Sequence, residues 1–250
     1  MNLDRRFSGL DRLFGRSGSE RIRSAHVAVV GVGGVGSWVA ESLARSGVGR
    51  LTLIDFDQVA QSNINRQIHA TESSLGQAKV LAMNQRIQSF FPECEVTCIE
   101  AFAEPENWPG ILPADVGAVI DACDQTSAKT VIAAWAVKFK RIHVAVGAAG
   151  GKRHAHLVAV GDLADVTHDP LLAKMRYQLR KYHVAPRPGK KMGVTCVYSR
   201  ETVAPPDASC GVGGDGSLNC HGFGSLVTVT ATFGQCAAGI ILNKLAEDPS

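Results

Sequence analysis

Residues 26–67 read HVAVVGVGGVGSWVAESLARSGVGRLTLIDFDQVAQSNINRQ, a succession that predicts a strand, a glycine-rich turn, a helix and a second strand. The β-branched run at 27–30 and the apolar run at 51–54 predict buried strands, and residues 35–46 predict the helix between them. A strand, a crossover helix and another strand form the unit of a parallel sheet. We therefore expect an α/β fold with a Rossmann-like, mostly parallel sheet, helices on both faces, and an antiparallel continuation starting at 155–160.

Glycines mark the first turn of this unit, and an acid follows its second strand. Gly31, Gly33 and Gly36 satisfy the pattern G-x-G-x-x-G, in which the backbone can approach a phosphate at the helix N-terminus. Asp55 stands nineteen residues after Gly36 and is placed to hydrogen-bond the hydroxyls of a ribose. These features indicate an adenine nucleotide, and a dinucleotide-dependent oxidoreductase would show them too.

Polar residues downstream of this acid distinguish a triphosphate from a dinucleotide. Asn63, Arg66 and Gln67 follow the second strand, and Lys79 ends the segment GQAK. Two fixed cations and an amide donor suit a ligand that carries three phosphates. A dinucleotide carries less charge and needs a nicotinamide pocket, for which the sequence gives no indication. The pattern therefore favours ATP.

Four motifs follow one another along the chain: GVGGVGS at 31–37, DFDQVAQSNINRQ at 55–67, GQAK at 76–79 and DACD at 121–124. Together they resemble the ubiquitin-activating-like adenylating superfamily, which includes ThiF, MoeB and HesA. The N-terminal segment RFSGLDRLFG, a long basic insert and an apolar C-terminal segment are most similar to its branch of tRNA threonylcarbamoyladenosine dehydratases. The resemblance covers nearly the whole chain and implies ATP-dependent activation of a carboxylate.

The glycine pattern, the acid and this resemblance together predict the nucleotide site. The residues expected to contact ATP are Gly31, Gly33, Gly34, Gly36, Asp55, Asp57, Asn63, Arg66, Gln67, Lys79 and Asp121. The resemblance places phosphate contacts on Arg66 and Lys79 and a magnesium ion on Asp124. A hard cation that bridges phosphate oxygens needs such a carboxylate. Asp57 is also consistent with a residue that only fixes the turn, and Asp121 with one that orients the following helix.

An arginine near the N-terminus is expected to complete the site across a homodimer. Residues 3–24 predict a polar helix, and in the superfamily an arginine of this segment reaches the neighbouring subunit's ATP. Arg12 best matches it, Arg6 and Arg16 are alternatives, and a solvated helix face is the simpler explanation. An inserted cation stabilises the charge that develops as pyrophosphate leaves. The expected catalytic set is Arg12, Arg66, Lys79 and Asp124.

The composition indicates one soluble domain in a reducing, cytoplasmic compartment. The chain has 250 residues, a formal net charge of +3, seven cysteines without a disulfide framework, and no apolar signal segment at its N-terminus. The apolar segment 223–245 is interrupted by polar residues and glycines, which favours a packed core helix over a membrane span. We expect an N-terminal helical arm (1–25), a nucleotide-binding half (26–150) and a substrate-binding half (151–250).

A basic insert lies in the second half, at 170–200, and contains no acidic residue. The residues expected to bind tRNA are Lys174, Arg176, Arg180, Lys181, Arg187, Lys190 and Lys191. Phosphates would supply the affinity, and the interleaved Tyr177 and Tyr182 are suited to stack on bases. A solvated basic face is the alternative, and the resemblance favours tRNA.

The sequence gives little support for a zinc site or for a catalytic cysteine. The chain lacks the two C-x-x-C pairs that hold zinc in many members of the superfamily, so no zinc is expected, even though 210–221 holds two cysteines and a histidine. His154 and His156 are expected on one strand face and are more typical of a solvated pair. Cys196 or Cys220 as a nucleophile has no supporting motif. The resemblance also implies a structural monovalent cation, Na⁺ or K⁺, which the sequence does not locate.

The resulting prediction is ATP-dependent dehydration, with cyclisation, of threonylcarbamoyladenosine next to the anticodon of tRNA. A sulfur-relay protein is considered as an additional partner, and no membrane contact is expected. One alternative is adenylation of the C-terminal glycine of a ubiquitin-like sulfur carrier, which the basic insert and the missing C-x-x-C pairs disfavour. A dinucleotide-dependent oxidoreductase is disfavoured by Arg66 and Lys79. A non-catalytic tRNA-binding module is disfavoured by the intact set of ATP residues.

Overall fold

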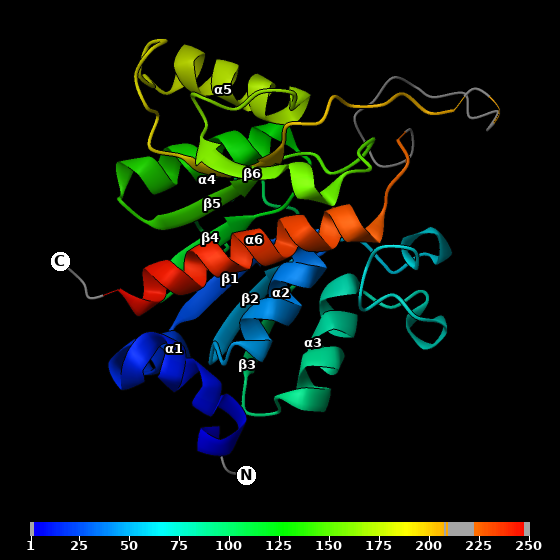
Figure 1. The fold of residues 1–250 in the computed structure, drawn as a ribbon, viewed down its shortest axis with the longest axis vertical. Coiled ribbons are helices and arrows are strands. Elements are labelled where there is room, and N and C mark those ends of the chain that lie inside the picture. The colour runs from blue at the N-terminus through cyan, green and yellow to red at the C-terminus, as the bar shows by residue number, and fades with distance from the viewer. Residues whose placement is uncertain (1–2, 208, 210–222, 248–250) are drawn as a thin grey trace.

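A seven-stranded sheet runs through the whole molecule and confirms the predicted α/β fold (Figure 1). The structure, a computed structural model, describes residues 3–207, 209 and 223–247. The strand order is β3-β2-β1-β4-β5-β7-β6, and neighbours are parallel except β6 and β7, which pair antiparallel. The strands are β1 (His26–Val30), β2 (Arg50–Ile54), β3 (Glu95–Ile99), β4 (Ala118–Asp121), β5 (Ile142–Val146), β6 (Val158–Asp162) and β7 (Thr195–Ser199).

Helices cover both faces of this sheet. They are α1 (Leu3–Ser24), α2 (Gly36–Arg45), α3 (Lys79–Phe90), α4 (Thr126–Lys138), α5 (Pro170–Tyr182) and α6 (Val227–Ala246). Short 3-10 helices lie in the loops: η1 (Gln61–Asn63), η2 (Glu72–Ser74) and η3 (Ala155–Leu157). The strand, helix and strand predicted within 26–54 are present, with each end within one residue of the expectation. The predicted N-terminal helix is α1, which is kinked where Gly15 leaves the helical conformation.

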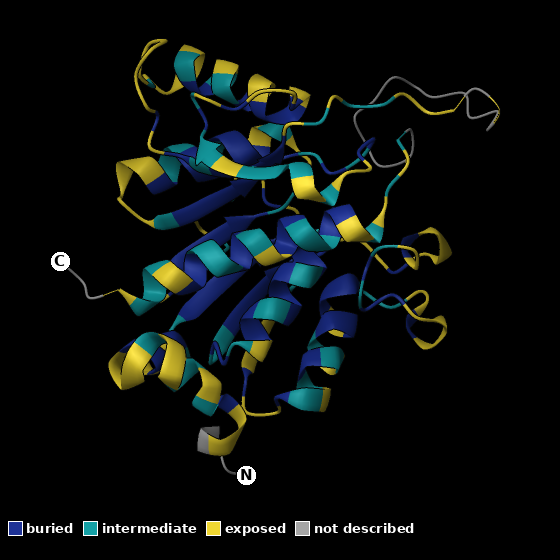
Figure 2. Cartoon of the chain, viewed as in Figure 1, coloured by how far each residue is buried: buried dark blue, intermediate teal, exposed yellow. Residues whose placement is uncertain are grey.

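The central strands are buried on both faces, as is usual in parallel sheets. Every residue of β1 and β4 is buried, and Figure 2 shows these strands as the dark interior of the molecule. One face packs against α2, α3 and α6 through Val39, Met83 and Phe233. The other face packs against α4 through Ile132 and against the loop residue Trp108. Burying each such side chain contributes roughly 1.5–3 kcal/mol to folding.

The apolar C-terminal segment forms α6, which is the core helix that its composition predicted. Phe233 and Ile241 are fully buried. Gly234 allows α6 to approach α2 closely, because a Cβ at this glycine would lie 2.8 Å from Trp38 Cβ. Within residues 3–207, 209 and 223–247, no helix combines the length and the apolar character that a membrane span needs.

Residues 155–160 differ from the prediction, because η3 occupies their first half and β6 begins only at Val158. His154 and His156 therefore do not share a strand face. The carboxylate of Glu201 accepts a hydrogen bond from the His154 backbone N–H and lies 3.0 Å from its Nδ1 atom. This contact from a distant part of the chain favours a turn at this point, and nothing in the local alternation of residues indicates it.

The parallel strands give the sheet two ends of different character. We call the end where β1, β2, β4 and β5 finish the carboxyl side, and the end where they begin the amino side. The helix α1 leads into β1 and lies at the amino side, where Gly18 packs against Ala246 at the end of α6 (Figure 1). Strands of five residues separate the two sides by about 17 Å.

Candidate nucleotide site

The glycine turn after β1 lies directly against the loop after β4. Gly31 has a φ of 84°, and a Cβ there would lie 2.9 Å from backbone atoms of Ala122 and Cys123. A Cβ at Gly36 would lie 1.7 Å from the Gly31 carbonyl oxygen. Neither position accepts a side chain, so the predicted role of these two glycines in shaping the turn agrees with the geometry. The contact brings the loop that carries Asp124 to the glycine turn.

The turn exposes backbone donors at the N-terminus of α2. Within the described part of the chain, the N–H groups of Gly33, Gly34 and Val35 donate no hydrogen bond, and Val35 caps the helix without a side-chain bond. Free N–H groups at a helix N-terminus, together with the positive end of its dipole, favour a phosphate. The Arg66 side chain lies above Gly34, since a Cβ there would be 3.3 Å from Arg66 Cδ. Gln67 lies nearest to Gly33, 3.9 Å from the corresponding position.

Asp55, the residue expected to bind the ribose, also stabilises the glycine turn. Its Oδ2 accepts a hydrogen bond of 2.6 Å from Val32 N, and its Oδ1 accepts one of 2.8 Å from Asp57 N. Burial raises the pKa of Asp55, and the nearby Lys79 ammonium and the two N–H donors oppose that shift. Each carboxylate oxygen has a second lone pair, so the residue can hold the backbone and still accept ribose hydroxyls.

Lys79 is held at the carboxyl side by Asp57. The Lys79 Nζ atom lies 2.7 Å from Asp57 Oδ2, and the Lys79 backbone N–H donates to the Asp57 carbonyl at 2.9 Å. The side chain of Lys79 is 8 % exposed, whereas that of Asp57 is 55 % exposed. The predicted alternative for Asp57, that it only fixes the turn, is therefore incomplete, because this acid also orients the lysine.

Arg66 is supported by its own loop and by α2. Its Nη1 donates to Ser62 O at 2.8 Å and to Asn65 Oδ1 at 2.9 Å, and its carbonyl accepts from Trp38 Nε1 at 3.0 Å. The buried Asn63 accepts a hydrogen bond from the backbone at the start of η1. These bonds keep the guanidinium beside the glycine turn before any ligand is bound.

Asp121 forms a buried ion pair with Lys129 instead of facing the turn. Both side chains are 0 % exposed, and Lys129 Nζ lies 3.0 Å from Asp121 Oδ2. The same ammonium donates to the carbonyls of Asp121 and Cys123, each at 3.2 Å. Burial lowers the pKa of Lys129, but the charge and hydrogen bond of Asp121, together with the nearby thiols, outweigh burial, and the net shift is upward. The pair ties the end of β4 to α4, which agrees with the alternative that Asp121 orients the following helix. Its contact with the nucleotide stays a prediction.

Sequence reasoning missed Lys129. Its signal was a lysine near the start of an otherwise apolar helix, TSAKTVIAAWAVK, eight residues after Asp121. It also missed Lys152, which is 2 % exposed and donates to the carbonyls of His168 and Glu201 at 3.2 and 2.8 Å. Burial lowers the pKa of Lys152, and the carboxylate of Asp169 opposes this. The burial of both lysines and the partners that they bind become evident only in the folded structure.

Asp124 is exposed in the loop after β4, at the carboxyl side. It forms no ion pair within the described residues, so its carboxylate is free to meet a cation. The described ranges contain no group of three or more His, Cys, Asp or Glu that could hold a metal ion by itself. Mg²⁺ commonly binds one or two carboxylates and takes its remaining ligands from phosphates and water. The donor set therefore fits a nucleotide-bound Mg²⁺ ion.

The residues predicted for the dimer and for tRNA lie elsewhere. Arg12 is exposed on α1, at the amino side, and does not join the nucleotide site of its own chain (Figure 1). Arg176 donates to the carbonyls of Leu163 and Val166 at 3.0 and 2.8 Å, and Arg180 donates to Pro186 O at 3.2 Å. These hydrogen bonds tie α5 to the segment before it and to the loop after it. Of the residues predicted to bind tRNA, those that are exposed are Lys174, Lys181, Arg187, Lys190 and Lys191.

The thiols give no sign of a nucleophile. Cys196 is fully buried, and burial raises the pKa of its thiol. Burial also raises the pKa of Cys94 to about 12 and that of Cys98 to about 11. A thiol with a raised pKa is a poor source of thiolate. Cys220 and the rest of the segment 210–221 lie outside the described residues.

The whole chain can be compared with known proteins. The family model described as "ThiF family" matches residues 8–249. The tRNA threonylcarbamoyladenosine dehydratase of Haemophilus influenzae is 39 % identical, with 100 % of this chain and 96 % of that protein covered. The enzyme of the same name from Escherichia coli is 40 % identical, with 96 % of this chain and 93 % of that protein covered. A crystal structure of E. coli TcdA in complex with ATP has a TM-score of 0.88 at 40 % identity, covering 97 % of this chain and 94 % of that one.

Proposed function

The chain belongs to the ThiF family, and from this premise we propose that it is an ATP-dependent tRNA threonylcarbamoyladenosine dehydratase. The relatives that share 39–40 % of its residues over almost their full length carry this activity in their names. The observation that carries the proposal is the arrangement at the carboxyl side. Arg66 lies over Gly34 of the glycine turn, the loop that leads to Asp124 packs against Gly31, and Lys79 lies close enough to Asp55 to act on its charge. These residues form a site for three consecutive phosphates.

The reaction has two steps. An oxygen of the threonyl carboxylate attacks the α-phosphorus of ATP, an O–P bond forms, and the bond to the bridging oxygen breaks as pyrophosphate leaves. A nitrogen of the same modification then attacks the activated carbonyl carbon and loses its proton, and AMP leaves with the carboxylate oxygen. The modified nucleoside loses one water in total. Positioning and neutralisation of phosphate charge supply most of the rate in such a reaction.

Each residue of the site has a proposed role. Arg66 and Lys79 neutralise phosphate oxygens, and the side chains that already hold them reduce the cost of ordering them when ATP binds. Asp55 accepts the ribose hydroxyls. Asp124 would hold a Mg²⁺ ion, and that ion would supply neutralisation of the charge that develops on the leaving pyrophosphate. The proposal also includes the structural Na⁺ or K⁺ ion that the family resemblance implies, and it assigns no residues as ligands of that ion.

Further parts of the proposal concern assembly. Arg12 lies on α1, away from the site of its own chain, which is consistent with delivery to the ATP of a second subunit in a homodimer. In the proposed division, residues 26–150 bind the nucleotide and residues 151–250 bind the substrate. The exposed cations of the insert would contact tRNA, and the reaction would take place in the cytoplasm. A sulfur-relay protein remains a proposed additional partner.

The deciding experiment measures pyrophosphate release with three additions: tRNA that carries threonylcarbamoyladenosine, a ubiquitin-like sulfur carrier, and neither. We expect release only with the modified tRNA, together with conversion of its nucleoside to the cyclic form in mass spectra. Release with the carrier alone would favour the alternative adenylation. A chain that releases no pyrophosphate but binds nicotinamide dinucleotides would contradict the proposal.

A further inference from the structure

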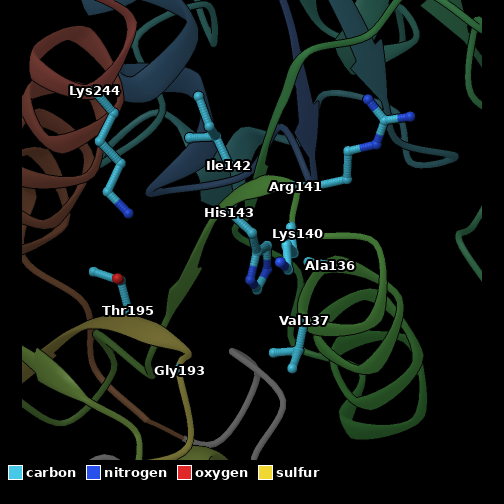
Figure 3. Close-up of a pocket in the computed structure, with 9 residues that line it drawn as sticks. All are labelled: Ala136, Val137, Lys140, Arg141, Ile142, His143, Gly193, Thr195 and Lys244. Atoms are coloured by element: carbon cyan, nitrogen blue, oxygen red, sulfur yellow. The ribbon is translucent and has the colours of Figure 1, made fainter. Parts of the chain in front are cut away.

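A cavity of about 400 Å³ opens at the amino side of the sheet, away from the nucleotide loops (Figure 3). It lies between the end of α4, the starts of β5 and β7, and the last turn of α6. The polar side chains that line it are Lys140, Arg141, His143, Thr195 and Lys244. In Figure 3 the His143 ring lies between Lys244 on one side and Lys140 and Val137 on the other, while Arg141 extends from the rim.

The cations of this cavity lack acidic partners. Within residues 3–207, 209 and 223–247, none of Lys140, Arg141 and Lys244 forms an ion pair. The carboxylate of Asp162, at the end of β6, accepts hydrogen bonds from the backbone N–H groups of Met192 and Gly193, both at 2.8 Å. The residues that line the cavity include three cations and no acid. The cavity keeps a net positive charge that suits an anion.

His143 provides a buried polar atom without a partner. The residue is 6 % exposed, and its Nε2 atom makes no hydrogen bond among the described residues. Burial lowers the pKa of His143 to about 4, so the ring is neutral at pH 7. An unpaired buried polar atom is costly to leave unsatisfied. This nitrogen has less than 1 Å² of solvent-accessible surface, so His143 lines the cavity as a neutral ring and is not a ligand of the anion.

Lys140 occupies a backbone conformation that is unfavourable for a lysine. It follows the C-cap residue Phe139 of α4 and has a φ of 50°. Glycine is the usual residue at this position, because a side chain disfavours the left-handed conformation. A cation at this point therefore costs stability, which indicates that its charge is used.

The basic insert reaches the rim of the same cavity. Arg187, Lys190 and Lys191 are exposed in the loop that leads through Gly193, a lining residue, into β7. The positive surface is thus longer than a single small anion needs, and successive phosphates of a nucleic acid would match it. The amino side lies about 17 Å from the carboxyl side across the strands, so one RNA stem and its loop can extend over both.

We propose that this cavity binds a backbone phosphate of the tRNA whose anticodon loop lies at the nucleotide site. The proposal rests on the proposed function for the identity of the RNA. Lys244 and Lys140 pair with the phosphate, the Thr195 hydroxyl donates a hydrogen bond to it, and the insert contacts the neighbouring phosphates.

Binding of the modified tRNA by Lys244→Gln and Lys140→Gly proteins tests this. We expect each variant to bind about fivefold more weakly and to lower the slope of log affinity against log salt by about one. Lys138→Gln removes an equal charge from the same turn outside the cavity, and it should bind as the wild type does. Unchanged affinity in both cavity variants would overturn the proposal. Melting temperature and ATP affinity, measured in parallel, separate lost phosphate contacts from lost folding.

A second experiment tests whether the cavity binds a phosphate of RNA or free inorganic phosphate. The imidazole signals of His143, assigned by comparison with His143→Gln, are followed by NMR during titration with tRNA or with inorganic phosphate. We expect them to shift with tRNA. A shift with inorganic phosphate alone, with normal tRNA binding by the variants, would mean that the cavity holds a small anion and that the proposal is wrong. The binding arms need no turnover, so loss of pyrophosphate release in the wild type would contradict only the proposed function.

Discussion

At the carboxyl side of the sheet, Lys79 and Lys129 are held by acidic partners, whereas the cations that line the cavity at the amino side have none within the described residues. Lys79 is paired with Asp57, and Lys129 with Asp121. Lys140 and Lys244, about one strand length away, face an open cavity. The difference matches the two proposed tasks. Transfer of an adenylyl group requires donors fixed in advance, whereas binding of a long polyanion requires available charge.

Removal of Asp124 should have the largest effect at the carboxyl side. We expect Asp124→Ala to lower pyrophosphate release about a thousandfold, because the carboxylate that we propose to hold Mg²⁺ is lost, while the affinity for tRNA stays within twofold of the wild type. Stopped assays of pyrophosphate and filter binding of tRNA measure the two quantities. Glu106→Ala, at another exposed acid, serves as the control. Retained turnover in Asp124→Ala would remove this residue from the metal role.

Lys129→Met should give the largest loss of stability. The change leaves the Asp121 carboxylate buried without its partner, and breaking such a pair costs about 3–5 kcal/mol. For a chain of this size the melting temperature should fall by at least about 6 °C. Lys138→Met, on the exposed side of the same helix, should change it little. Addition of Asp121→Asn to Lys129→Met should restore part of the loss, and a double variant no more stable than the single one would argue against the pair.

The nucleotide half of the site was predictable from sequence because its residues are adjacent in local motifs. The glycine turn, Asp55, Arg66 and Lys79 all lie within 31–79, and each lies at the carboxyl side as expected. The buried pair of Asp121 and Lys129 was not predicted, since it depends on how α4 packs over β4. The same holds for the cavity around His143, which gathers residues from α4, β5, β7 and α6.

The basic insert shows the limit of composition as evidence. Its run of cations predicted one uniform tRNA surface, but Arg176 and Arg180 are bound to backbone carbonyls of the protein itself. Charge counts do not distinguish a guanidinium that anchors a loop from one that faces solvent. A charge reversal at Arg176 would therefore disturb the fold, and it is unsuited to test RNA binding.

Lys79→Gln should have an intermediate effect, which sharpens the comparison between fixed and available charge. We expect pyrophosphate release to fall about thirtyfold, because a phosphate loses its cation. Stability should change by less than about 1 kcal/mol, since Asp57 is mostly exposed and regains water. Lys138→Gln is the matched control. A large drop in melting temperature with normal turnover would mean that Lys79 is a structural residue.

Lys140→Gly should give the smallest effects. It should raise the stability of the protein and weaken its binding of tRNA. Glycine relieves the left-handed backbone at φ 50°, so the free energy of unfolding should rise by about 1 kcal/mol and the melting temperature by about 2–4 °C. Lys138→Gly, two residues earlier and within α4, removes the same charge but should lower stability by about 0.5–1 kcal/mol. If the charge at 140 serves RNA, the more stable protein binds tRNA more weakly, and the less stable one binds it normally. A Lys140→Gly protein that gains stability and keeps its full affinity for tRNA would leave the strained lysine without a function in binding.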